Sequence, residues 1–387
     1  MPRRRSNLIP ATALALVLGV VFLMGVMPLL ESFLPVPRDL SIKLDWLRSR
    51  VMECLIIGWF FLFGSMVGSF INVVVWRMPR GVSVVSDGSA CPYCRVPIRL
   101  VDNIPVFGWI KLKGRCRVCR LPISPRYPIV EAIFGLVFLL MFFVELQTGG
   151  SNLPGDQPSS GTGILRTILS ANWQLVGTYS YHMLLLVMLL TWTLIVFDRN
   201  RIPLKTIVFA WVLGLAIPCF FPAVQPLSWL DASNPVNTEI SWFSSRGFIT
   251  ALIGWAAGCS AGMGLQMILM RRVDHQGSAN GMALCLTTLG LYMGWQFLIL
   301  AIAALGPILL IRQVFPRSRR WPYPGWVTVS AIGILCFWKP LHVAGPISQT
   351  WPYWGVLILM GVFFVWLSTS LESSGIKNET PDLDLDT

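Results

Sequence analysis

Four cysteines in a short polar segment carry the clearest chemistry in this sequence. They form two Cys-x-x-Cys pairs, separated by 21 residues: Cys91, Cys94, Cys116 and Cys119. Each such turn presents two thiolates to one ion, so two pairs at this spacing predict a tetrahedral zinc site. The alternative is a pair of disulfides, which are rare in a reducing cytoplasm. We expect structural zinc, because the segment is too short to fold around a core of its own.

Ordered motifs surround the two cysteine pairs. The segments are residues 68–81, 102–106, 114–119 and 123–131. Together they closely resemble, over residues 64–135, the N-terminal domain of the bacterial type IV prepilin peptidases. One position departs from that family, since Val96 stands where the family usually has a histidine.

The resemblance implies a bifunctional membrane enzyme of the type IV pilus or type II secretion pathway. Such an enzyme cleaves the leader of a prepilin or pseudopilin after a glycine and then methylates the new N-terminal amine. S-adenosylmethionine would be required only for that second activity. The resemblance makes Asn72, Arg77 and Glu131 candidates for substrate or interface contacts. Asn72 and Arg77 are equally compatible with a polar anchor at a helix end.

The cleavage half of the family depends on two aspartates near the cytoplasmic ends of two helices. Carboxylates that share a proton act as base toward water and as acid toward the scissile carbonyl. Aligned on Ile202-Pro203, the first position holds Val196 in this sequence. Aligned on the Leu-Gly and Gly-Trp-Gln residues of 289–296, the second position holds Met282. Neither side chain exchanges protons, so we expect a degenerate peptidase centre.

Two other aspartates offer a rearranged dyad. Of the eleven aspartates, Asp198 and Asp274 are expected near the cytoplasmic ends of the relevant helices. Alternatively, both are solvated charges in basic turns, since Arg199 and Arg201 follow Asp198 and two arginines at 271–272 precede Asp274.

A strongly apolar composition determines which elements can position these residues. Hydrophobic residues make up 55% of the 387 and charged residues 12%, against about a quarter charged in soluble domains. The net charge of +12 is not accompanied by a basic helix or an array of stacking aromatics, so nucleic-acid binding is not expected. We predict an all-α polytopic membrane bundle with a small inserted four-cysteine, zinc-ribbon-like domain.

About ten apolar stretches are long enough to cross the lipid bilayer as helices. They lie near 8–30, 54–76, 128–145, 174–197, 203–223, 247–270, 281–295, 297–311, 325–343 and 351–371. Two of them, 281–295 and 297–311, are short and could form a hairpin that does not fully cross.

The predicted domain organisation follows from these stretches. A signal anchor and linker (1–53) precede an entry helix with the four-cysteine domain (54–135) and a peptidase-like bundle (136–320). Two additional helices (321–371) and an acidic, disordered tail (372–387) complete it.

Charge predicts the orientation. Residues 77–126 hold ten Lys or Arg and two Asp, whereas the loops 146–173 and 224–246 hold one Arg each. Because basic residues gather on the cytoplasmic side of membrane proteins, we expect the four-cysteine loop and both termini in the cytoplasm of a bacterium, with the bundle in its inner membrane.

Two classes of function fit the sequence. One is a prepilin peptidase-like membrane protein that processes prepilins or pseudopilins as an aspartic endopeptidase, an N-methyltransferase or both. The other is a non-catalytic membrane protein that binds prepilin N-terminal segments. Val196 and Met282 leave the question of enzymatic activity open.

Overall fold

The computed structural model describes residues 38–85, 88–154, 172–225, 245–270, 276–314 and 321–343. Within them the regular structure is helical, with two isolated β-bridges, so the all-α prediction is confirmed. The predicted helices at 8–30 and 351–371 and the acidic tail lie outside the described residues. The chain divides into two compact units, Met1–Phe61 and Leu62–Thr387.

Five helices of the described residues are long and apolar enough to cross a membrane. They are α3 (Arg38–Arg77), α5 (Arg126–Met141), α7 (Trp173–Phe197), α9 (Ser245–Met270) and α10 (Gln276–Val314), with α5 extended by the π-helical turn η4 (Phe142–Leu146). Two shorter apolar helices are α8 (Leu204–Phe220) and α11 (Tyr323–Cys336). Short helical segments complete the set: η2 (Met78–Arg80), η3 (Leu100–Asp102), α4 (Phe107–Lys111), η5 (Pro222–Val224) and α12 (Trp338–Val343).

The two short spans predicted at 281–295 and 297–311 meet inside α10. Gly294 separates them, because its backbone (φ 79°, ψ 173°) is not helical. Glycine adopts such a conformation at little steric cost, whereas a β-carbon would oppose it. The helix is therefore interrupted close to the boundary predicted between the spans 281–295 and 297–311.

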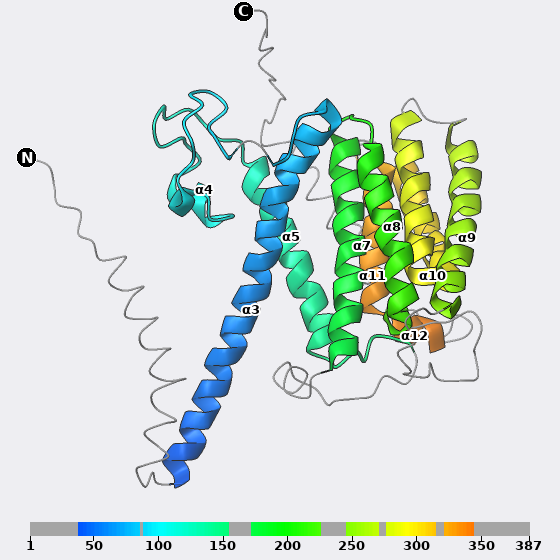
Figure 1. The fold of residues 1–387 in the computed structure, drawn as a ribbon, viewed down its shortest axis with the longest axis horizontal. Helices are drawn as coiled ribbons and strands as arrows, with labels where there is room; N and C mark the ends of the chain where they lie inside the picture. Colours follow the sequence, from blue (N-terminus) through cyan, green and yellow to red (C-terminus); the bar gives the residue numbers. More distant parts are fainter. Residues whose placement is uncertain are drawn as a thin grey trace, which may run out of the picture. The chain divides into compact units, whose positions relative to one another are not determined.

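Helices α9 and α10 approach each other closely through small residues (Figure 1). A β-carbon on Gly258 would lie 2.7 Å from the Leu286 carbonyl oxygen, and one on Gly262 would lie 2.8 Å from that of Ala283. Small residues allow membrane helices to pack backbone to backbone, which compensates for the missing hydrophobic driving force in lipid. The spacing of four residues puts both glycines on one face of α9.

The part of α3 that follows Phe61 packs against α5 in the same way. A β-carbon on Gly64 would lie 2.7 Å from Phe138 Cβ, and one on Gly68 would lie 2.9 Å from Glu131 Cα. The four-cysteine loop leaves the end of α3 and returns at the start of α5, with η3 and α4 between them (Figure 1). The close packing of α3 on α5 thus fixes the base of this loop.

Candidate metal centre and the expected dyad position

The two cysteine pairs adopt the same backbone conformation. The N–H of Cys91 donates to the Val96 carbonyl (3.1 Å), and the N–H of Arg95 donates back to the Cys91 carbonyl (2.9 Å). The second turn repeats this pattern. The N–H of Cys116 donates to the Leu121 carbonyl, and the N–H of Arg120 donates back to the Cys116 carbonyl. The residue after each pair, Arg95 and Arg120, has positive φ (54° and 62°). Each β-bridge closes one turn, Ala90 with Pro97 and Arg115 with Pro122.

The four sulfur atoms converge on one point. All lie within 4.8 Å of one another, with 3.8 Å between Cys91 and Cys119 and 3.9 Å between Cys94 and Cys116. Four thiolates at about 2.3 Å from one zinc ion in a tetrahedron would be separated by about 3.8 Å. A disulfide would require about 2.05 Å, and all four cysteines are free. The predicted metal-binding cluster is confirmed in its geometry.

The two cysteines of the second turn ionise differently. A backbone hydrogen bond involving Leu121 lowers the pKa of the Cys119 thiol, but burial and hydrogen bonds with Cys116, Cys91 and Cys94 outweigh it and raise that pKa to about 11. Backbone hydrogen bonds from Cys119 and Val118 to the Cys116 sulfur lower the pKa of that thiol to about 6. The surrounding residues are mostly basic: Arg95, Arg99, Lys111, Lys113, Arg115, Arg117 and Arg120. Positive charge near a thiol stabilises the deprotonated form that binds metal.

A buried carboxylate connects η3 to the second cysteine turn. Asp102, with a side chain only 2% exposed, accepts two hydrogen bonds from the Arg117 guanidinium (2.6 and 2.5 Å) and lies 3.5 Å from Lys111 Nζ. The hydrogen bonds with Arg117 lower the pKa of Asp102 below its ordinary value. The Trp109 indole N–H donates to the Ile123 carbonyl (3.0 Å), so α4 is tied to the segment that enters α5.

The three predicted contact residues all lie at the junction between the helices and the four-cysteine domain. Asn72 donates to the Tyr127 carbonyl (3.3 Å), which joins α3 to the start of α5. Arg77 donates to the Ser83 carbonyl (3.3 Å). Glu131 accepts the backbone N–H of Val106 at 2.6 Å, and Val106 has positive φ (63°), a conformation that a β-branched residue rarely adopts.

The structure brings together the two positions where the resemblance implies catalytic aspartates. A β-carbon on Gly281, the residue before Met282, would lie 3.0 Å from Val196 Cγ2 and 2.8 Å from Pro324 Cγ. Met282 is fully buried and Val196 nearly so. The end of α7 and the start of α10 therefore lie beside each other, and the side chains of Val196 and Met282 there are apolar and buried.

Asp198, one half of the alternative dyad, is paired with a cation from another part of the chain. Its Oδ2 lies 2.6 Å from Arg126 Nη2 at the start of α5. Asp274 lies outside the described residues, so the pairing of the two aspartates stays a prediction.

Sequence reasoning missed a second polar pair inside the bundle. His182 Nδ1 on α7 lies 2.6 Å from Glu145 Oε1 in η4, and both side chains are fully buried. An acidic residue within an apolar span was the available signal, since ionisable groups are rare there and pair with one another.

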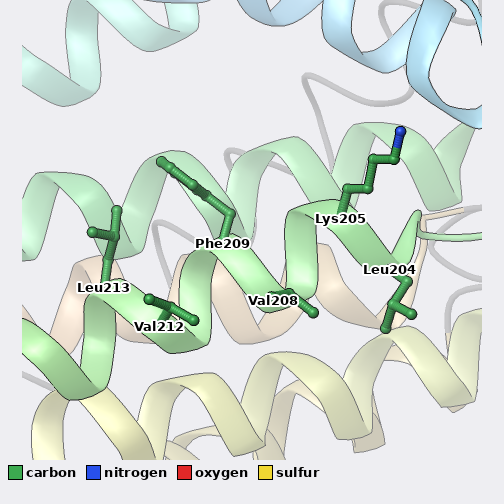
Figure 2. Close-up of a pocket in the computed structure, with 6 residues that line it drawn as sticks. All are labelled: Leu204, Lys205, Val208, Phe209, Val212 and Leu213. Carbon is green, nitrogen blue, oxygen red and sulfur yellow. The ribbon is translucent and has the colours of Figure 1, made fainter.

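One hollow on the described surface is apolar and formed by a single helix. Figure 2 shows its six residues along α8: Leu204, Lys205, Val208, Phe209, Val212 and Leu213. Lys205 is the only charged group among them, and nothing in this hollow resembles a catalytic centre.

Comparisons with known proteins agree with this geometry over the four-cysteine domain. Residues 62–144 match the family described as Bacterial Peptidase A24 N-terminal domain. The chain is 40% identical over 104 residues to the "Type 4 prepilin-like proteins leader peptide-processing enzyme" of Escherichia coli O78:H11 (strain H10407 / ETEC), which covers 22% of this chain and 39% of that protein. The predicted resemblance to the prepilin peptidases is thereby confirmed for this segment.

Two further relatives give the same result. The "Prepilin leader peptidase/N-methyltransferase" of Klebsiella pneumoniae is 48% identical over 86 residues (21% of this chain, 38% of that protein). The protein of that name from Myxococcus xanthus (strain DK1622) is 47% identical over 78 residues (20% and 23%). The chain thus spans less than half the length of each of these relatives. No solved structure matches it.

Proposed function

We propose that this relative of the prepilin leader peptidases binds type IV prepilins or pseudopilins at the bacterial inner membrane and does not cleave their leaders through an aspartic dyad. The proximity of Val196 to Gly281, the residue before Met282, carries the proposal, because the side chains at the two positions that the resemblance assigns to the catalytic carboxylates are apolar and buried. Without an ionisable group at either position, neither a general base nor a general acid acts there.

Substrate binding is supported by the part of the chain that the relatives share. The matched residues include the four cysteines and the junction residues Asn72, Arg77 and Glu131. Methyl transfer from S-adenosylmethionine to the N-terminal amine of a pilin is the catalytic activity that this chain could retain, since it does not require the aspartates.

We assign zinc to the four cysteines and a cytoplasmic location to their loop. Four protein thiolates complete a tetrahedral shell, which is typical of structural zinc and leaves no open position for a substrate. The metal would hold the two cysteine turns together. The excess of basic residues in the loop supports the cytoplasmic side for it and, by alternation of the spans, for both termini.

A second candidate is leader cleavage by a rearranged dyad of Asp198 and Asp274. Its support is the position of Asp198 at the C-terminal end of α7, two residues after Val196. The ion pair with Arg126 weighs against it, because the Asp198 carboxylate already faces a guanidinium at 2.6 Å rather than a second carboxylate.

The two candidates are separated by the mass of a co-expressed pilin. A prepilin with a glycine at the end of its leader is expressed in a host without prepilin peptidase, together with the native chain or an Asp198→Ala, Asp274→Ala variant. We expect an intact leader with both, and co-purification of the prepilin with both. Leader loss with the native chain alone would establish the rearranged dyad. An intact leader without co-purification would refute binding.

A pre-cleaved pilin tests the methyltransferase activity separately. A mass increase of one methyl group on its N-terminal amine would assign that activity to this chain. An unmodified amine together with co-purification would leave binding as the function.

A further inference from the structure

The turn between the two cysteine pairs exposes an unusual run of apolar side chains. Leu100 is 88% exposed, and four more large apolar residues in η3, in α4 and between them are 46–58% exposed: Val101, Ile104, Phe107 and Ile110. The two elements are held together, because the Lys111 ammonium donates to the Val101 carbonyl at 3.2 Å. Several large apolar side chains exposed on one short turn are typical of a site of contact with a protein or a membrane.

A hydrogen bond fixes the depth of this turn relative to α5. Val106, at its centre, donates its N–H to Glu131 at 2.6 Å. Glu131 lies five residues past Arg126, at which the candidate membrane span Arg126–Leu146 begins. Since a helix rises 1.5 Å per residue, the Glu131 backbone lies about 7.5 Å along α5 from the first residue of that candidate span.

Aromatic residues mark the level of the membrane surface at the same place. Trp76 in the last turn of α3 and Tyr127 in the first turn of α5 are both about half exposed. Such residues are enriched at the boundary between headgroups and acyl chains. The Arg80 guanidinium lies over the Trp76 ring (4.9 Å), as expected where the chain leaves the apolar region. The turn Leu100–Ile110 is therefore held near this boundary.

The charge around the turn identifies the surface that it would contact. Residues 88–125 hold seven Lys or Arg and a single acidic residue, Asp102. The Asp102 carboxylate is already neutralised by Arg117 and Lys111. Basic residues beside exposed apolar ones are the pattern that binds anionic lipid headgroups.

We propose that the turn Leu100–Ile110 inserts its apolar side chains into the headgroup region of the anionic cytoplasmic leaflet, while the flanking basic residues contact lipid phosphates. The four-cysteine domain then lies on the membrane surface rather than free in the cytoplasm. A domain that lies on the membrane surface and a substrate that is anchored in the membrane encounter each other by diffusion in the plane of the bilayer. The contact with lipid does not depend on whether the chain binds or modifies prepilins.

Photolabelling by lipid tests this contact in the full-length protein. The chain is reconstituted in nanodiscs of phosphatidylglycerol that contain a lipid with a diazirine near the headgroup end of its acyl chain. After illumination, trypsin releases Leu100–Lys111 as one peptide, because Arg99 precedes it and Lys111 ends it. We expect lipid adducts on this peptide, and several-fold fewer in nanodiscs of phosphatidylcholine. Adducts on the peptides of α5 serve as the internal standard.

A matched pair of variants shows whether the apolar side chains cause the labelling. Leu100→Ser with Ile110→Ser should reduce the adducts on this peptide several-fold. Val85→Ser should leave them unchanged, although Val85 is as exposed (89%) as Leu100. An unlabelled turn beside a labelled α5 would overturn the proposal and favour an acidic protein partner. Equal labelling in both lipids would overturn the role of anionic headgroups.

Discussion

The Arg126 guanidinium lies 2.6 Å from the Asp198 carboxylate, although the two residues are 72 positions apart. Arg126 begins α5, at the exit of the four-cysteine domain, and Asp198 caps the C-terminal end of α7. The pair therefore connects the four-cysteine domain to the C-terminal end of α7. We expect a carboxylate in this ion pair to stabilise the interface rather than to activate water.

Removing either member of this pair should weaken the junction without creating or abolishing leader cleavage. The side chains are partly exposed (33% and 18%), so we expect a coupling energy of about 0.5–1 kcal/mol. A double-mutant cycle with Asp198→Asn and Arg126→Gln, read by unfolding of the detergent-solubilised protein, measures it. Additive effects of the two substitutions would show that the pair is not formed.

The cysteine cluster should hold one metal ion per chain. Cys116→Ser should lose the metal, because three thiolates and a neutral hydroxyl bind zinc far more weakly than four thiolates. Cys285→Ser, in α10 and outside the cluster, is the matched control and should retain it. Elemental analysis of the purified proteins gives the metal content. A metal-free native protein whose thiols become reactive only after reduction would show disulfides instead.

Asp102 should stabilise the four-cysteine domain by an amount that does not change between pH 6 and 8. Its pKa is lowered by Arg117, so its contribution is complete above its unfolded pKa of 3.8 and is lost only as pH falls through the lower folded value. We expect Asp102→Asn to speed metal transfer to a chelator several-fold, by the same factor at pH 6 and pH 8.

The control for this experiment is Lys111→Gln, which removes the more distant and more exposed partner of Asp102 and should have a smaller effect. If Asp102→Asn accelerated metal transfer by a factor that differed several-fold between pH 6 and pH 8, a group other than Asp102 would be titrating in this range.

The pair of Glu145 and His182 should be strongly non-additive. Glu145→Leu alone leaves a fully buried imidazole without its partner, and breaking a buried pair costs about 3–5 kcal/mol. Adding His182→Phe removes the unpaired group and should recover part of the loss. Unfolding of the single and double variants in mixed detergent measures this. A double variant as unstable as the sum of both singles would show that the two groups do not interact.

Features that depend on local spacing could be predicted from the sequence. Cys91, Cys94, Cys116 and Cys119 converge because two short turns each fix a pair of thiols, whatever the rest of the fold does. The apolar stretches within the described residues are helical because length and hydropathy decide this in lipid. The break at Gly294 lies where two short segments were expected to meet.

Features that depend on which helix faces meet could not be predicted. Arg199 and Arg201 are the nearest cations to Asp198 in the sequence, yet Arg126 from another helix is its partner. His182 showed no clustering with the other histidines, and its partner Glu145 lies in a separate span. Long-range pairs of this kind follow from tertiary packing, which hydropathy and residue spacing do not specify.

The most direct test of the central claim is cleavage of a purified prepilin by the native chain in liposomes, read by intact mass. Because Val196 and Met282 stand where the resemblance implies carboxylates, we expect the leader to stay intact, while a functional prepilin peptidase removes it under the same conditions. A Val196→Asp, Met282→Asp variant shows whether cleavage is gained once both carboxylates are present. Removal of the leader by the native chain would contradict the proposal that this chain does not cleave prepilins.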